Sequence, residues 1–159
     1  MMNTPHILTG AAIGVATGNP ILGFLGGLAS HFVLDAIPHT DPGTWHFEEP
    51  LPFKIDERDL TAAFIDLAIA AVLLVWLAGN VPIAAAAPLA AMFGAILPDI
   101  FIVSLLFWPR LVTVPGFSHY DKFNRMLQAQ STAKPHQWAL GILTQVAVTV
   151  GAVWFLLVS

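Results

Sequence analysis

The segment from residue 31 to residue 39 carries three side chains of the kinds that bind metal ions. His31, Asp35 and His39 follow one another at intervals of four residues. On an α-helix this spacing keeps the side chains on one side, because each step of four residues drifts by only about 40°. Histidine and carboxylate groups one turn apart can bind the same ion. The spacing therefore predicts a metal site on one helix face.

Four further residues are candidates for the same site: His6, Asp66, Asp99 and His119. Asp66 and Asp99 lie inside apolar segments, where acidic groups are costly and usually face the interior of a helix bundle for a functional reason. We expect His6 and Asp99 to complete the metal ligands. Asp66 or Asp99 would supply a second ligand or the general base, and His119 would protonate the leaving group.

Two of these acids have alternative roles that the sequence leaves open. Asp66 could form a hydrogen bond between helices, or an ion pair with Arg58. Asp99 follows a proline and could cap a half-helix instead of binding an ion.

The absence of cysteine restricts the metals that this set can bind. Without thiolate ligands, a site made of imidazole and carboxylate groups suits a divalent ion such as Zn²⁺ or Mn²⁺.

The composition indicates an integral membrane protein. Apolar residues make up 57% of the chain and charged residues 10%, and the mean hydropathy is +0.75. Soluble domains carry about 25% charged residues, so this chain has too few to cover a globule with a polar surface. The net charge of −4 and the six basic residues exclude a nucleic-acid-binding class.

The apolar segments predict an all-α fold, a compact bundle of about five helices that forms one membrane-embedded domain over residues 1–159. A helical hairpin comes first, with Thr4 as the cap of its first helix and a turn at Thr17–Pro20. Three spans follow, the second of them broken at Leu97–Asp99. The expected helices are Pro5–Thr17, Pro20–Ile37, 60–78, 82–108 and 136–159, with a further amphipathic helix within 117–131.

Glycines recur at intervals of four residues in both hairpin helices, at Gly10, Gly14 and Gly18 and at Gly23 and Gly27. Such stripes of small residues let membrane helices approach closely. We expect them to pack the two helices of the hairpin together, with the histidines and Asp35 pointing into the bundle at one end.

The basic residues predict the orientation in the membrane. With a full hairpin first, the N-terminus and the loops 38–59 and 109–135 share one face, and this face carries every lysine and arginine. By the positive-inside rule this face is cytoplasmic. We therefore expect a multi-pass protein of the bacterial inner membrane.

The sequence resembles a known family in three places: "HILTGAAIG", "SHFVLDAIPH" and "LPD". These stretches are similar to the YdjM-like inner-membrane proteins described as metal-dependent hydrolases, over about residues 4–120. The resemblance implies metal ligands at His6, His31, Asp35, His39, Asp99 and His119. The family often has a second Asp and a His just after the Pro-Asp pair, where this chain has "PDIFIV", so the number of metals stays open. A weaker likeness, to zinc-dependent phospholipase C proteins, rests on the His–Asp spacing alone.

These observations favour a metal-dependent hydrolase acting at the cytoplasmic membrane face on a phosphoester or lipid phosphate. Arg110, Lys122 and Arg125 lie in the basic loop, where they would bind a phosphate group. Two alternatives remain: a metal or proton transporter, and a non-catalytic membrane subunit with a structural metal. The oligomeric state is left open.

Overall fold

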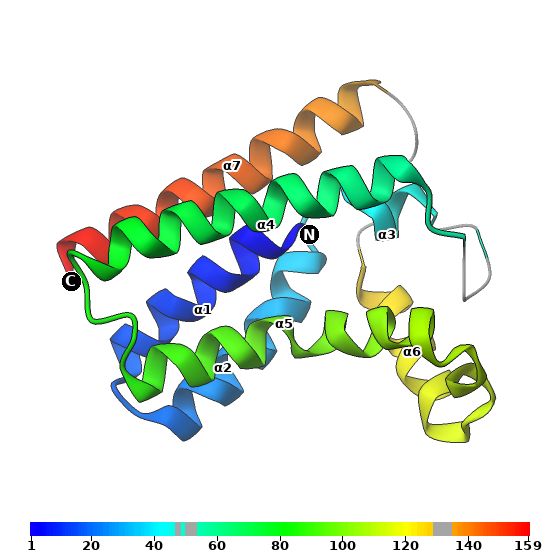
Figure 1. Cartoon of the computed structure of the whole chain (residues 1–159), viewed down its shortest axis with the longest axis horizontal. Helices are drawn as coiled ribbons and strands as arrows, with labels where there is room; N and C mark the ends of the chain where they lie inside the picture. Colours follow the sequence, from blue (N-terminus) through cyan, green and yellow to red (C-terminus); the bar gives the residue numbers. More distant parts are fainter. Residues whose placement is uncertain (47–48, 50–53, 129–134) are drawn as a thin grey trace.

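A computed structural model describes residues 1–46, 49, 54–128 and 135–159 of the chain (Figure 1). The described part contains seven α-helices and one 3₁₀ helix, η1, which confirms the expected all-α class. The helices are α1 (Asn3–Thr17), α2 (Pro20–Asp35), α3 (Pro42–Trp45), α4 (Glu57–Ala78), α5 (Ala86–Phe107), η1 (Pro109–Thr113), α6 (Pro115–Leu127) and α7 (Pro135–Val158).

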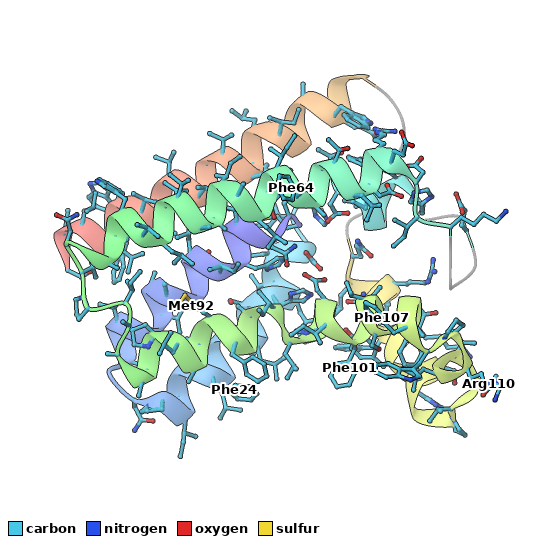
Figure 2. All side chains as sticks on the ribbon, in the orientation of Figure 1. Phe24, Phe64, Met92, Phe101, Phe107 and Arg110 are labelled. Carbon is cyan, nitrogen blue, oxygen red and sulfur yellow. The ribbon has the colours of Figure 1, made fainter. Side chains whose placement is uncertain are left out.

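Three helices are long and apolar enough to cross a membrane: Glu57–Ala78, Ala86–Leu105 and Gln137–Val158. Large apolar side chains project outward along these helices, and Phe64 and Val75 on α4 are 75% and 77% exposed (Figure 2). Such surfaces suit lipid and not water. The three apolar helices and their exposed surfaces indicate a membrane protein.

The hairpin helices α1 and α2 are shorter, at 15 and 16 residues. They meet at a tight turn in which Gly18 adopts a positive φ of 58° and donates its N–H to the Gly14 carbonyl at 3.0 Å. The Asn19 side chain then accepts hydrogen bonds from the first two N–H groups of α2, at 2.9 and 3.1 Å. The predicted turn is confirmed.

The first helix begins differently from the expectation. Thr4 lies inside α1, and no side chain at the N-cap position forms a capping hydrogen bond. Instead the Thr4 N–H lies 3.2 Å from both carboxylate oxygens of Asp66, and the Thr4 hydroxyl donates to the Asp66 carbonyl at 2.8 Å. The prediction of Thr4 as the cap is wrong because a carboxylate from α4 satisfies this helix end.

The glycine stripes pack mainly against a third helix, α5. This corrects the expectation that they pack α1 and α2 against each other. A Cβ atom at Gly10 would lie 2.8 Å from the Ala91 carbonyl oxygen, and one at Gly23 would lie 2.9 Å from the Ala87 carbonyl oxygen. A Cβ at Gly14 or Gly27 would also meet the backbone of α5. Because α1 and α2 both present glycines to α5, these three helices form the close-packed centre of the protein.

The helix α5 runs without a break through Pro98, so the expected interruption at Leu97–Asp99 is wrong. A proline removes only one hydrogen bond from the ladder, and neighbouring elements make this tolerable in membrane helices. The hydroxyl of Tyr120 on α6 donates to the Pro98 carbonyl at 2.9 Å.

The polar elements gather at one end of the molecule. In Figure 1, α3 and α6 lie at one end, whereas the C-terminus and the turns between α1 and α2 and between α4 and α5 lie at the other. At the polar end, the Arg58 guanidinium stacks over Trp45 at 4.0 Å and over Trp138 at 4.8 Å, which links α3, α4 and α7. Arg58 therefore contacts aromatic rings there, whereas Asp66 bonds to Thr4.

Candidate metal centre

The centre is built around the last turn of α2. His31 and Asp35 lie one turn apart with exposed fractions of 1% and 4%. The His31 Nδ1–H donates to the Ala95 carbonyl of α5 at 2.8 Å, which fixes the ring and its tautomer. The other ring nitrogen, Nε2, lies 3.2 Å from Asp35 Oδ2.

The first helix contributes His6, which is fully buried. Its ring stacks on that of His31 with centroids 4.3 Å apart, and its Nε2 lies 3.1 Å from Asp35 Oδ1. Asp35 therefore faces imidazoles from two helices. The capping of α1 by Asp66 holds His6 at this depth, because Thr4 is only half a turn away.

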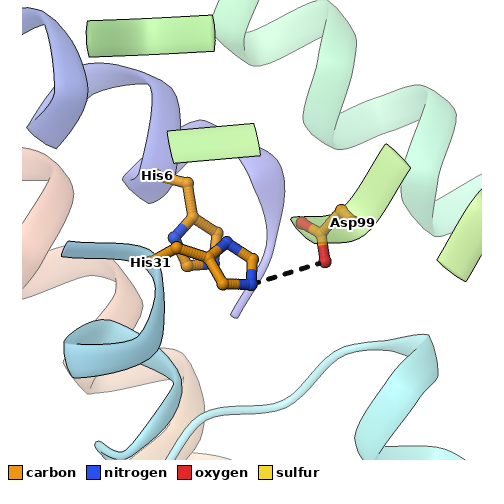
Figure 3. Close-up of side chains that lie close together, drawn as sticks. All are labelled: His6, His31 and Asp99. Atoms are coloured by element: carbon orange, nitrogen blue, oxygen red, sulfur yellow. Dashed lines mark ion pairs between the residues drawn. The ribbon is translucent and has the colours of Figure 1, made fainter. Parts of the chain in front are cut away.

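The helix α5 contributes Asp99, whose Oδ1 lies 3.8 Å from His31 Nε2. His6, His31 and Asp99 each offer a ligand atom, and these three atoms lie within 4.8 Å of one another (Figure 3). This spacing could hold a metal ion. The Asp99 side chain is 37% exposed, so one side of the group opens outward.

His39 follows the end of α2 and is also fully buried. Its Nδ1–H donates to the Ile37 carbonyl at 2.8 Å, and its Nε2 lies 4.0 Å from Asp35 Oδ1. The helix ends at Asp35, two residues before the expected end at Ile37, so His39 reaches the centre from the loop.

Asp41 joins the centre without having been predicted. It is 7% exposed, and its Oδ2 lies 3.1 Å from His39 Nε2. Burial disfavours its charged form, but the Met1 ammonium group, 2.8 Å away, outweighs this and holds the pKa of Asp41 below its usual range. The only signal was the Asp-Pro-Gly sequence two residues after His39, which reads as an ordinary turn.

Three histidine nitrogens without hydrogen-bond partners indicate that these residues can bind a cation. His6 Nδ1, His31 Nε2 and His39 Nε2 are buried and have no hydrogen-bond partner. In His31 and His39 the proton lies on Nδ1, so a neutral ring presents a bare lone pair at Nε2. Such a lone pair beside a carboxylate oxygen is unfavourable unless a cation lies close to both. The cluster therefore has the chemistry of a metal site.

The structure brings together His6, His31, Asp35, His39 and Asp99, the five residues predicted as metal ligands.

The two residues predicted as catalytic lie elsewhere. Asp66 is buried against Thr4 at the start of α1. His119 is exposed on α6, with Nδ1 2.7 Å from the Pro115 carbonyl. Their chemical roles stay predictions.

A cavity of about 480 Å³ adjoins the centre. Asp35, Asp41 and Asp99 line it on the side of the centre, and Arg125 lines it from α6. Apolar side chains from facing sides of α4 and α5 form a large part of the remaining wall, to which α6 adds the polar residues Asp121 and Asn124. The apolar lining residues include Leu60, Ala63, Leu67, Ile96, Ile100 and Val103. Leu60 and Leu67 are 60% and 51% exposed, so the cavity is open along α4.

These features define a class: a helical membrane protein with a buried cluster of histidines and aspartates. Comparison with protein families, curated proteins and solved structures finds no match for the chain. The resemblance to YdjM-like proteins therefore stays a prediction from three short sequence stretches.

Proposed function

We propose that the protein is a metal-dependent hydrolase of lipid phosphoesters, embedded in the bacterial inner membrane with its charged loops in the cytoplasm. The observation that carries this proposal is the buried cluster of imidazoles and carboxylates beside a cavity with an apolar wall. Buried titratable groups that converge at a cavity are typical of an active site.

The residues that would hold the ion are His6, His31 and Asp99, with Asp35 between the two histidines. A bound Zn²⁺ or Mn²⁺ acts as a Lewis acid and lowers the pKa of water to about 7, which supplies a nucleophile at neutral pH. Asp99 is the partly exposed member and lines the cavity, which supports a second role for this ligand as the carboxylate that would accept a proton from water.

The cavity supports an amphiphilic substrate. Its walls on α4 and α5 offer apolar contacts for an acyl chain, and Arg125 offers a guanidinium to a phosphate. Arg125 is held by Asp121 at 3.0 Å and donates to the Glu49 carbonyl at 3.1 Å. Of the three basic residues predicted to bind phosphate, Arg125 lines the cavity in the described structure, whereas Arg110 and Lys122 are exposed and do not line it.

A structural metal site is the second candidate, and the burial of all three imidazoles favours it. Structural sites are closed by protein ligands, whereas catalytic sites keep a position open. The exposure of Asp99 and the adjoining cavity favour the hydrolase.

The test begins with metal content. Wild type and His31→Ala are purified in detergent, loaded with Zn²⁺ or Mn²⁺, and measured by elemental analysis. We expect stoichiometric metal in wild type and its loss in His31→Ala, because His31 contacts Asp35 and lies beside Asp99. His119→Ala is the matched control and should retain metal, since His119 is exposed on α6.

Activity is then measured with phosphatidic acid and phosphatidylglycerol in mixed micelles. We expect metal-dependent release of phosphate or of the headgroup by wild type, and about a hundredfold less by His31→Ala, because loss of even an outer-shell partner of a metal site typically costs about 10–100-fold in activity. Metal-loaded wild type without turnover of either lipid would contradict the hydrolase and favour the structural site.

A further inference from the structure

Asp35 lies at the middle of the centre and faces three imidazoles. Its Oδ1 lies 3.1 Å from His6 Nε2 and 4.0 Å from His39 Nε2, and its Oδ2 lies 3.2 Å from His31 Nε2. The two oxygens of this carboxylate therefore point to different histidines. A carboxylate placed in this way can bridge two ions.

A second group of ligands lies on the His39 side of Asp35. Asp41 uses Oδ1 to accept a hydrogen bond from the Thr44 N–H at 2.7 Å, which caps α3. Its Oδ2 is turned to His39 Nε2, at 3.1 Å. The cap thus holds one oxygen of Asp41 and leaves the other in the centre.

The spacing of these atoms matches that of neighbouring ligands on one ion. Two ligand atoms, each about 2.1 Å from a metal and at 90–109° to each other, lie about 3.0–3.4 Å apart. The pair His39 Nε2 and Asp41 Oδ2 is 3.1 Å apart, and yet His39 Nε2 has no hydrogen-bond partner. In the neutral ring, whose proton lies on Nδ1, two electron-rich atoms face each other there, and this pair is favourable only with a positive group beside it.

The structure already shows that a positive group is accommodated at this position. The Met1 ammonium group contacts Asp35 Oδ1 and lies 2.8 Å from Asp41 Oδ2, with its nitrogen fully buried. It therefore lies between the two carboxylates, and a divalent cation bound there would displace it.

We propose that the centre binds two divalent cations, with Asp35 as the bridging carboxylate and with His39 and Asp41 as the other ligands of the second cation. The first cation is that of the proposed hydrolase, at His6, His31 and Asp99. The catalytic use of the second cation therefore rests on the proposed function. Zn²⁺ and Mn²⁺ both suit the imidazole and carboxylate ligands.

The charges explain what a second ion adds. Asp35, Asp41 and Asp99 bring three negative charges, and the histidines are neutral ligands. One divalent ion leaves the ligand set with a net charge of −1, which becomes zero when the Met1 ammonium group is counted, so the set does not attract an anionic phosphoester. Two divalent ions give it a positive charge, and in two-metal hydrolases the pair stabilises both the attacking and the leaving oxygen.

The experiment counts metals per chain in wild type and in Asp41→Asn, after loading with Mn²⁺. We expect two equivalents in wild type and one in Asp41→Asn. The asparagine retains an oxygen for the Thr44 N–H, so α3 keeps its cap. Asp56→Asn is the matched control: Asp56 caps α4 by the same kind of hydrogen bond, at 3.0 Å, but lies outside the centre. This control should keep both ions.

Electron paramagnetic resonance gives an independent readout. Two bridged Mn²⁺ ions are spin-coupled, so wild type should lack the simple six-line signal of an isolated ion, and Asp41→Asn should show it. Asp35→Asn should weaken the binding of both ions, since it removes the bridge.

One equivalent in wild type that is unchanged in Asp41→Asn would overturn the inference and leave Asp41 as the partner of the Met1 ammonium group. Two equivalents that both persist in Asp41→Asn would overturn it as well. Two coupled ions without lipid turnover would support the two-metal centre and contradict the hydrolase, so the two proposals fail separately.

Discussion

Asp66 illustrates how the same buried acid can serve structure or chemistry. The sequence placed it among the catalytic candidates, because an acid inside an apolar helix is costly. In the structure its carboxylate accepts from the Thr4 N–H, and its backbone carbonyl accepts from the Thr4 hydroxyl. Sequence spacing does not predict this contact, because the two residues are 62 positions apart.

We therefore expect Asp66→Ala to lower stability and to leave the metal content unchanged. The substitution leaves the Thr4 N–H buried without a partner, which costs about 1–3 kcal/mol. Asp66→Asn keeps an acceptor oxygen and should cost less. Thermal unfolding in detergent, followed by elemental analysis, checks both. If Asp66→Ala instead lost activity with its stability and metal content unchanged, the result would indicate a catalytic role for Asp66.

At the scale of the helices, the sequence predicted the positions of the elements better than their partners. Turn residues and hydrophobic runs located the hairpin and the three spans to within a few residues, because these signals are local. The glycine stripes predict a contact between α1 and α2, whereas in the structure they lie mainly against α5. A stripe of small residues indicates that some helix approaches closely, but not which one.

The same limit explains why the sequence predicts some of the candidate metal ligands but not Asp41. His31 and Asp35 share one helix turn, so their proximity follows from spacing. Asp41 reaches the centre only because the chain turns back after α2 and α3 begins there. Contacts made through a loop have no sequence period to reveal them.

The packing of α5 predicts opposite effects for two glycines. Gly27→Ala would place a Cβ against the Ala91 backbone of α5, so we expect a loss of about 1–3 kcal/mol of stability from overpacking. Gly151→Ala is the matched control, because a Cβ there meets nothing within 4 Å. Since alanine favours a helix over glycine by about 0.5–1 kcal/mol, this control should be neutral or more stable. Thermal unfolding in one detergent compares them, and equal melting temperatures would contradict the packing.

For the whole molecule, the depth of the centre explains why a cavity accompanies it. Asp99 is eight residues from the end of α5, which corresponds to about 12 Å from the polar end of that helix. The substrate of the proposed hydrolase would need a path to a site at this depth, and the cavity between α4 and α5 offers a mostly apolar one. This arrangement suits a lipid better than a small soluble molecule.

The charged loops predict the side of the membrane from which the centre is reached, and single cysteines in this cysteine-free chain can test this prediction. Lys122 lies on α6 at the polar end, and Asn80 lies in the turn between α4 and α5 at the other end. By the positive-inside rule we expect a charged maleimide to label Lys122→Cys only after the cells are opened, and Asn80→Cys in intact spheroplasts. Val75→Cys, 77% exposed on a span, is the control that should resist labelling in both, because a thiolate does not form in lipid. Labelling of Lys122→Cys in intact spheroplasts would reverse the orientation and place the mouth of the cavity, where Arg125 lies, on the outer side of the membrane.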